Sequence, residues 1–189
     1  MPGFSFKRLL VSSVVVLATL AVAAPCVSAA TRSTTFRLYM GQSTVSGYSS
    51  DGASVHVVWR GVGGALKRDA VYTAAKHGGY WEAASSSGQV VRVGNIVKAT
   101  VNGKTHKLVV PLLRIRISSA NDLFYGRAPA GSTIKLGCDN RGSEVSVKVG
   151  ADGHWRYSEP DFDVPSGLHA YARWTSKGGD TVTFDQIAS

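Results

Sequence analysis

Short runs of alternating polar and apolar residues recur along the chain, and no segment keeps an apolar period of 3.6 residues. In the clearest run, period two places Leu113, Ile115 and Ile117 on one face and the two intervening arginines on the other. Such a strand has one packed face and one wet face. The pattern predicts strands over 35–40, 54–60, 70–74, 79–83, 96–101, 107–110, 113–117, 133–138, 144–149, 155–158, 169–175 and 181–185. The chain is therefore expected to be all-β.

Turn signals separate these runs at regular intervals. Asn102-Gly103 and Asp152-Gly153 are dipeptides that tolerate positive φ at tight hairpin turns. The glycine-rich stretch 61–64 is expected to close a longer hairpin. Pro111 lacks an amide hydrogen and cannot continue a ladder in a central strand, so the boundary between two units is predicted there.

The same spacing of glycines and apolar residues occurs twice. The matched positions, pair by pair, are Gly47 with Gly126, Gly52 with Gly131, Val55 with Ile134, Trp81 with Trp155, Gly94 with Gly167, and Ala99 with Ala172. The offset between the copies falls from 79 residues at the first glycine to 74 at the tryptophan, which predicts a longer middle hairpin in the first copy. We therefore expect one small β unit present twice, as antiparallel β-sandwiches over 31–111 and 112–189 joined by a stiff connection.

The first thirty residues have the features of a secretory signal peptide. Lys7 and Arg8 precede an apolar run over 9–24, and small residues follow it up to Ala30. The run is shorter than the roughly twenty residues that cross a bilayer. Pro25 stands before Cys26 where lipid-attachment signals prefer a small residue, which argues against a lipid anchor. We predict a leader over 1–30, cleaved near Ala30, and a secreted product without a transmembrane span.

After that cleavage, Cys138 is the one remaining cysteine, so no intrachain disulfide can form. We expect Cys138 to be a small buried residue. The alternative is that it forms an intermolecular disulfide. The net charge of +9 falls to +7 without the leader. Ten basic residues face three acidic ones over 31–112, whereas nine face nine over 113–189. This asymmetry predicts that a polyanion would bind the first copy.

The spaced glycines, the turn followed by tryptophan and the alternating apolar residues resemble bacterial Ig-like repeats of secreted and cell-surface proteins. The resemblance covers nearly the whole chain after the leader and implies two tandem Ig-like sandwiches, the first basic and the second neutral. The chain departs from the pattern at Gly78-Gly79, where the second copy has Asp152-Gly153. Such modules serve as spacers, adhesins or binding appendages, so the resemblance implies no catalytic residues.

Aromatic residues offer one candidate site. Because Trp81 and Trp155 occupy matching positions, each is expected to anchor the core of its sandwich. The functional alternative is a platform for stacking sugars, to which Tyr80 and Trp59 could contribute.

Basic residues around the long hairpin offer a second candidate. Arg60, Lys67, Arg68 and Lys76 could form a patch facing acidic envelope polymers, anionic lipid or nucleic acid. The alternative is a solvated rim that keeps the protein soluble. Nucleic acid is an unlikely partner, because no aromatic interleaving and no recognition motif accompanies these charges.

Metal binding has weak support. The five histidines are scattered without ligand spacing, so zinc is not expected. Asp161, Asp163 and Asp180 are weak candidates for calcium, although aspartates in turns usually cap local backbone hydrogen bonds. No cofactor is predicted.

The sequence favours a secreted, non-enzymatic interaction or structural module at or outside the cell surface, with an unknown protein or surface polymer as partner. It contains no Gly-x-Ser-x-Gly elbow, no His-Glu-x-x-His helix and no phosphate loop. The main alternative is a carbohydrate- or polyanion-binding protein that uses the basic first copy. A small secreted hydrolase, or an inhibitor of one, is the third hypothesis.

Overall fold

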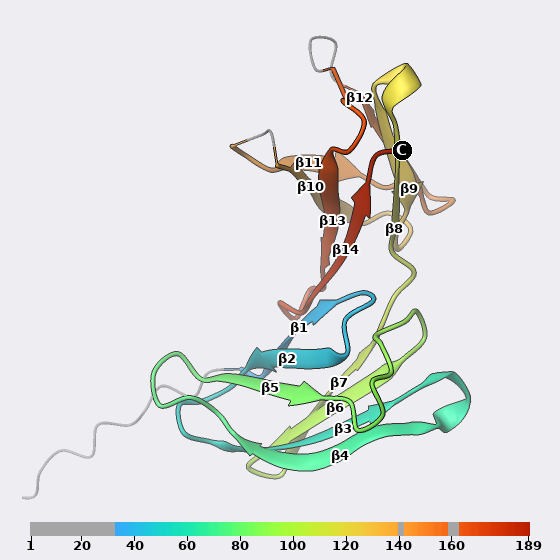
Figure 1. The fold of residues 1–189 in the computed structure, drawn as a ribbon. Helices are drawn as coiled ribbons and strands as arrows, with labels where there is room; N and C mark the ends of the chain where they lie inside the picture. The colour runs from blue at the N-terminus through green and yellow to red at the C-terminus, as the bar shows by residue number, and fades with distance from the viewer. Residues whose placement is uncertain (1–32, 140–141, 159–162) are drawn as a thin grey trace, which may run out of the picture.

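A computed structural model describes residues 33–139, 142–158 and 163–189 (Figure 1). The predicted leader, Cys26 and Asp161 lie outside these ranges. Fourteen β-strands and two short 3₁₀ turns make up the regular structure of the described residues, which confirms the all-β prediction. No helix in these ranges is long and apolar enough to cross a membrane.

Seven strands belong to each half of the chain. Those of the first half are β1 (Thr35–Tyr39), β2 (Thr44–Tyr48), β3 (Ser54–Arg60), β4 (Leu66–Thr73), β5 (Tyr80–Ala84), β6 (Ile96–Val101) and β7 (Lys104–Val109). Those of the second half are β8 (Arg114–Ser118), β9 (Leu123–Arg127), β10 (Thr133–Cys138), β11 (Val145–Lys148), β12 (His154–Ser158), β13 (His169–Thr175) and β14 (Thr181–Ile187). The 3₁₀ turns are η1 (Val62–Gly64) and η2 (Ser119–Asn121).

The two halves pair their strands in the same way. In the first half β1-β2-β5 lie side by side and face the sheet β4-β3-β6-β7. In the second half β12-β9-β8 form one sheet, and β11-β10-β13-β14 repeat the second arrangement. A sheet of three strands that faces a sheet of four is an Ig-like sandwich. In each half the fourth strand, β4 or β11, pairs with the third strand and not with the fifth. The predicted Ig-like fold and the longer middle hairpin of the first copy are both observed.

The matched glycines and tryptophans pack against each other in both halves. Gly47 lies opposite Trp81 across the β2–β5 pair, and Gly126 lies opposite Trp155 across the β9–β12 pair. A Cβ atom on Gly47 would lie 2.5 Å from the Trp81 ring, and one on Gly126 would lie 2.9 Å from the Trp155 ring. Both indoles are buried, with 2% and 4% of their surface exposed, which confirms the core-anchor prediction.

The matched glycines also explain why the alternation of polar and apolar residues did not predict β2 and β9. Strands β2 and β9 carry a glycine at the position that alternation would give to a large apolar residue, because an indole fills that space. Strand β4 begins at Leu66, four residues earlier than predicted, and places Lys67 at an inward position. Cys138 ends β10 and is buried, as expected.

A parallel strand pair joins the halves. β1 pairs with β14 in the register Arg37 to Thr181, Leu38 to Val182 and Tyr39 to Thr183. The Met40 amide extends the ladder by donating to the Thr183 carbonyl at 2.8 Å. One seven-stranded sheet, β11-β10-β13-β14-β1-β2-β5, therefore runs through both halves, and Figure 1 shows β14 (red) beginning beside β1 (blue).

Replacing the first matched glycine should destabilise the protein strongly. In Gly47→Ala the new methyl group would lie 2.1 Å from the Thr35 carbonyl oxygen as well as against the indole. Overpacking of this kind lowers the free energy of unfolding by about 2 kcal/mol or more. Chemical denaturation of Gly47→Ala and of the control Gly142→Ala, whose Cβ would meet no atom within 4 Å, measures the difference. Equal stabilities would show that the indole does not require the glycine.

Candidate functional site

Two members of the predicted first-half site are buried beneath the long hairpin. Trp59 has no exposed surface, and its Nε1 donates to Asn95 Oδ1 at 3.1 Å. Lys67 is 6% exposed, and its Nζ donates to the Val90 carbonyl at 2.7 Å and to the same Asn95 oxygen at 3.0 Å. The ammonium lies 5.0 Å from the centre of the Trp59 ring. Trp59 and Lys67 therefore do not form the expected exposed patch, although Lys67 lines a hollow of about 430 Å³ with Gly61 and Arg92.

The other predicted residues are accessible but separated. Arg60 is exposed at the end of β3 and donates to the Gly64 carbonyl at 3.1 Å. Arg68 lies over the Tyr72 ring at 5.6 Å. Lys76 is exposed and follows the last residue of β4, whereas Arg60 lies beside the first residue of that strand. These cations therefore do not form one continuous patch, and a binding role for them stays a prediction.

Tyr80 lies on a different strand, β5, in the sheet that faces β4 and β3. Its side chain is partly exposed and its hydroxyl donates to Glu82 Oε2 at 2.5 Å. Burial and this carboxylate raise the pKa of the phenol. Its ring packs edge-on against Tyr48 at 5.6 Å. The expected grouping of Tyr80 with Trp59 on one surface is absent, because Trp59 is buried.

Asp180 belongs to the joint between the halves. Its Oδ1 accepts from the Phe36 amide at 3.0 Å and contacts His106 Nε2 at 2.7 Å, while Oδ2 accepts from Ser176 Oγ at 3.0 Å. The His106 ring also stacks on Phe36, with ring centres 5.1 Å apart. This cluster, the Asp180 clasp, ties the β13–β14 turn to β1 and β7. Its carboxylate oxygens already have hydrogen-bond partners within the protein, and a calcium role for Asp180 stays a prediction.

The calcium candidate Asp163 lies near η2 and outside the Asp180 clasp. Asp163 is exposed and precedes Val164, whose amide donates to Asp122 Oδ1 near η2. Within the described ranges, no group of three His, Cys, Asp or Glu side chains could hold a metal ion. A metal role for Asp161 stays a prediction.

A cluster of arginines lies on the outward face of the three-stranded sheet β12-β9-β8. The strand registers place Arg114 opposite Arg127, and Arg116 opposite Tyr125, which is opposite Arg156 in turn. All four arginines are exposed. The arginine face is defined here as Arg114, Arg116, Arg127 and Arg156.

The charges of the arginine face are not neutralised within the described chain. No hydrogen bond or ion pair joins any of the four guanidinium groups to a described acidic side chain. Like charges directly opposite each other across a strand pair destabilise a sheet, as Arg114 and Arg127 do here. Asp152, in the turn before β12, accepts from the His154 amide at 3.0 Å, and this bond, together with the charges of His154 and Arg127, lowers the pKa of its carboxyl group. The face is therefore a concentrated positive surface in the half whose net charge is zero.

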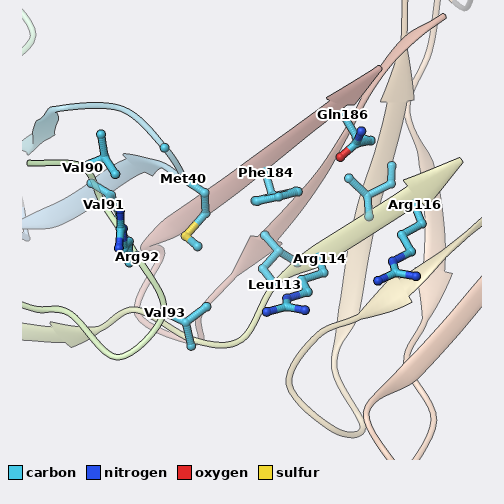
Figure 2. A pocket seen from close by; sticks show the side chains of 12 residues that line it. Met40, Val90, Val91, Arg92, Val93, Leu113, Arg114, Arg116, Phe184 and Gln186 are labelled. Atoms are coloured by element: carbon cyan, nitrogen blue, oxygen red, sulfur yellow. The ribbon is translucent and has the colours of Figure 1, made fainter. Parts of the chain in front are cut away.

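Hollows flank the arginine face on both sides. At the free edge of β8, a groove of about 510 Å³ is lined by Met40, Gly41, Val90, Val91, Arg92, Val93, Leu113, Arg114, Ile115, Arg116, Phe184 and Gln186. Figure 2 shows Arg92 toward one end and Arg116 toward the other, with Met40 and Phe184 between them. No acidic residue lines this groove. Over β9 and β12, a second hollow of about 480 Å³ is lined by Tyr125, Arg156, Lys148 and His154, and by one acidic residue, Asp152.

No protein-family model and no curated protein matches the chain. Among solved structures it is similar to the BSP domain of a biofilm-associated protein (14% identity, 82% of this chain and 29% of that one, TM-score 0.37). It is also similar to a tetra-tandem repeat in the extending region of a large adhesion protein (14%, 83% and 50%, TM-score 0.29) and to the FN1-FN3 domains of chicken CNTN1 (10%, 84% and 64%, TM-score 0.30).

These neighbours are adhesin, biofilm-associated and FN domains. The chain spans between 29% and 64% of the length of the three structures. At these identities and TM-scores, the likenesses assign no function to it.

The buried lysine should give the protein a distinctive pH dependence. Burial, and secondarily the charge of Arg92, lowers the pKa of Lys67 below its usual value of 10.5. The unfolded chain therefore binds more protons than the folded one in the window just below 10.5, and stability contributed by this group rises with pH through that window. Denaturation at pH 8 and 10 should show that wild type gains stability relative to Lys67→Met. Parallel pH profiles for the two proteins would contradict the lowered pKa.

Proposed function

We propose that the protein is a secreted, non-enzymatic Ig-like module that acts at or outside the cell surface and holds two sandwiches in a fixed relative orientation. The observation that supports this most is the β1–β14 pair, because it makes one sheet continuous through both halves. A module that holds two other groups at a fixed separation needs such stiffness, because a flexible joint would let its two ends reorient.

The connection along the chain also favours a stiff joint. Only four residues separate the end of β7 at Val109 from the start of β8 at Arg114. Val110 and Leu113 within this link are buried, with 1% and 0% of their surface exposed. A segment packed in this way has little freedom to act as a hinge.

The arrangement of Ser, His and Asp in the Asp180 clasp supports a non-enzymatic role. A nucleophilic triad places the histidine between the serine and the aspartate, so that the ring can remove the serine proton. Here Asp180 lies between His106 and Ser176, so the imidazole is not placed to remove the serine proton. The exposed pair His56–Asp69 has no described serine or cysteine partner.

Export is supported by the sequence of residues 1–30, in which Lys7 and Arg8 precede an apolar run that ends in small residues. Mass spectrometry of the protein released by an expressing bacterium tests it. A mature N-terminus near Thr31 is expected, and retention of the full leader on a protein inside the cell would contradict export.

Removing the Asp180 clasp should loosen the joint. Asp180→Ala leaves the buried Phe36 amide and His106 without their partner, and should lower the free energy of unfolding by about 3 kcal/mol. Asp69→Ala is the matched control, because it removes an aspartate from an exposed histidine pair worth at most about 1 kcal/mol. Denaturation midpoints measure the difference.

Small-angle scattering on the same proteins tests the proposed function. Wild type and Asp69→Ala should fit one fixed arrangement of the two halves, and Asp180→Ala should require a broader set. Wild-type scattering that only freely reorienting units can fit would contradict the proposal.

A further inference from the structure

We infer that the arginine face binds a linear polysaccharide that carries carboxylate groups. This inference goes beyond the structural role. The sheet that carries the face does not contain the β1–β14 pair, and only the groove at its β8 edge lies between the two halves. It also moves the expected polyanion site from the basic first half to the second half, whose net charge is zero.

The geometry of the face suits several carboxylates at once. Residues two apart on a strand lie roughly 7 Å apart, and strands two places apart lie roughly 10 Å apart. Arg114 and Arg116 share β8, whereas Arg156 lies two strands away on β12. Four guanidinium groups therefore lie within an area about as large as two or three sugar rings.

The chemistry of the side chains favours carboxylates. A guanidinium is planar and presents paired N–H donors that match a carboxylate with two parallel hydrogen bonds. Because no described acid pairs with these groups, a bound carboxylate would not have to displace a protein partner. It would also relieve the repulsion between Arg114 and Arg127. Binding should therefore stabilise the folded protein.

A tyrosine at the centre of the face favours a sugar polymer over other anions. Tyr125 lies between Arg116 and Arg156 in the same cross-strand row and is partly exposed. One aromatic face flanked by cations can stack on a sugar ring while the guanidinium groups hold its charged substituents. A nucleic-acid track would require a series of stacking rings, and Tyr125 is the one Tyr, Phe or Trp side chain on the outward face of this sheet, with only His154 as a second ring.

The flanking hollows favour a long ligand over a small anion. Arg92 continues the positive surface into the groove at the β8 edge. Lys148 places a further cation in the hollow over β9 and β12, where Asp152 is the one acidic lining residue. A polymer crossing β8 would meet cations on both sides, whereas a single small anion could occupy only one place.

Polygalacturonate, a linear polymer of a sugar acid, is the probe for the test. Its binding to the full chain is measured by calorimetry at about 0.15 M salt, where long-range screening is strong. Saturable binding is expected, and the fully methyl-esterified polymer, which has the same backbone without charge, should not bind. Absence of saturable binding to polygalacturonate would overturn the inference.

Matched double variants locate the site. Arg116→Gln with Arg156→Gln should weaken binding at least tenfold. Arg60→Gln with Lys76→Gln, which lowers the net charge by the same amount on the exposed hairpin, should change it less than twofold. Equal weakening by both pairs would show a diffuse charge effect and overturn the site. Thermal melting confirms that each variant folds, since all four positions are exposed.

Two further comparisons separate the ligand classes. Tyr125→Phe should bind as wild type and Tyr125→Ala at least fivefold more weakly, because the ring face and not the hydroxyl makes the contact. Tight, variant-sensitive binding to duplex DNA or to phosphatidylglycerol vesicles, with polygalacturonate weaker, would reject the polysaccharide in favour of a phosphate ligand. Loss of binding with unchanged scattering would leave the proposed stiff module intact, so the two proposals can fail separately.

Discussion

The parallel pairing of β1 with β14 is the constraint on which the arrangement of this molecule depends. β1 is the edge strand of the three strands from the first half, and β14 is the edge strand of the four from the second half. Without the pair, each would present unpaired backbone groups to solvent. Their pairing removes both liabilities and fixes the direction of one half relative to the other. The Asp180 clasp completes the joint, because its buried carboxylate accepts the Phe36 amide directly next to the ladder.

The same pairing determines where the hollows form. β14 follows β1 only as far as Thr183, and its later residues pair with β13 alone among the described strands. Phe184 and Gln186 therefore face the free edge of β8, and the groove with its arginines opens between them. The opposite sheet of the second half is left with its outer face uncovered, so the arginine face is accessible.

The fold could be predicted largely from local pattern. Period-two alternation identified most strands, and the repeated glycine and tryptophan spacing identified two equivalent units, because Gly47 and Gly126 each make room for an indole. No local sequence pattern of this kind predicts the joint between the halves. A pair between the first strand and the last depends on the meeting of residues about 140 positions apart, and nothing local to Leu38 or Val182 reports it.

The candidate site was harder to predict because charge counts ignore position. Alternation shows which face of a strand a residue occupies but not how deep that face lies, so Lys67 and Trp59 looked like surface residues and are buried. Arg114 and Arg116 were correctly placed on a wet face. Their grouping with Arg127 and Arg156 could be predicted only from the pairing register of β9. That strand was not predicted, because Gly126 interrupts its alternation of polar and apolar residues.

The fixed joint can be tested most directly by a distance measurement between the halves. Spin labels at Asp69→Cys and Ser166→Cys, both exposed and one in each half, are introduced with the buried Cys138 changed to serine. Pulsed dipolar spectroscopy should give a single narrow distance distribution. A broad or multiply peaked distribution from the folded protein would contradict the claim that one continuous sheet holds the halves together.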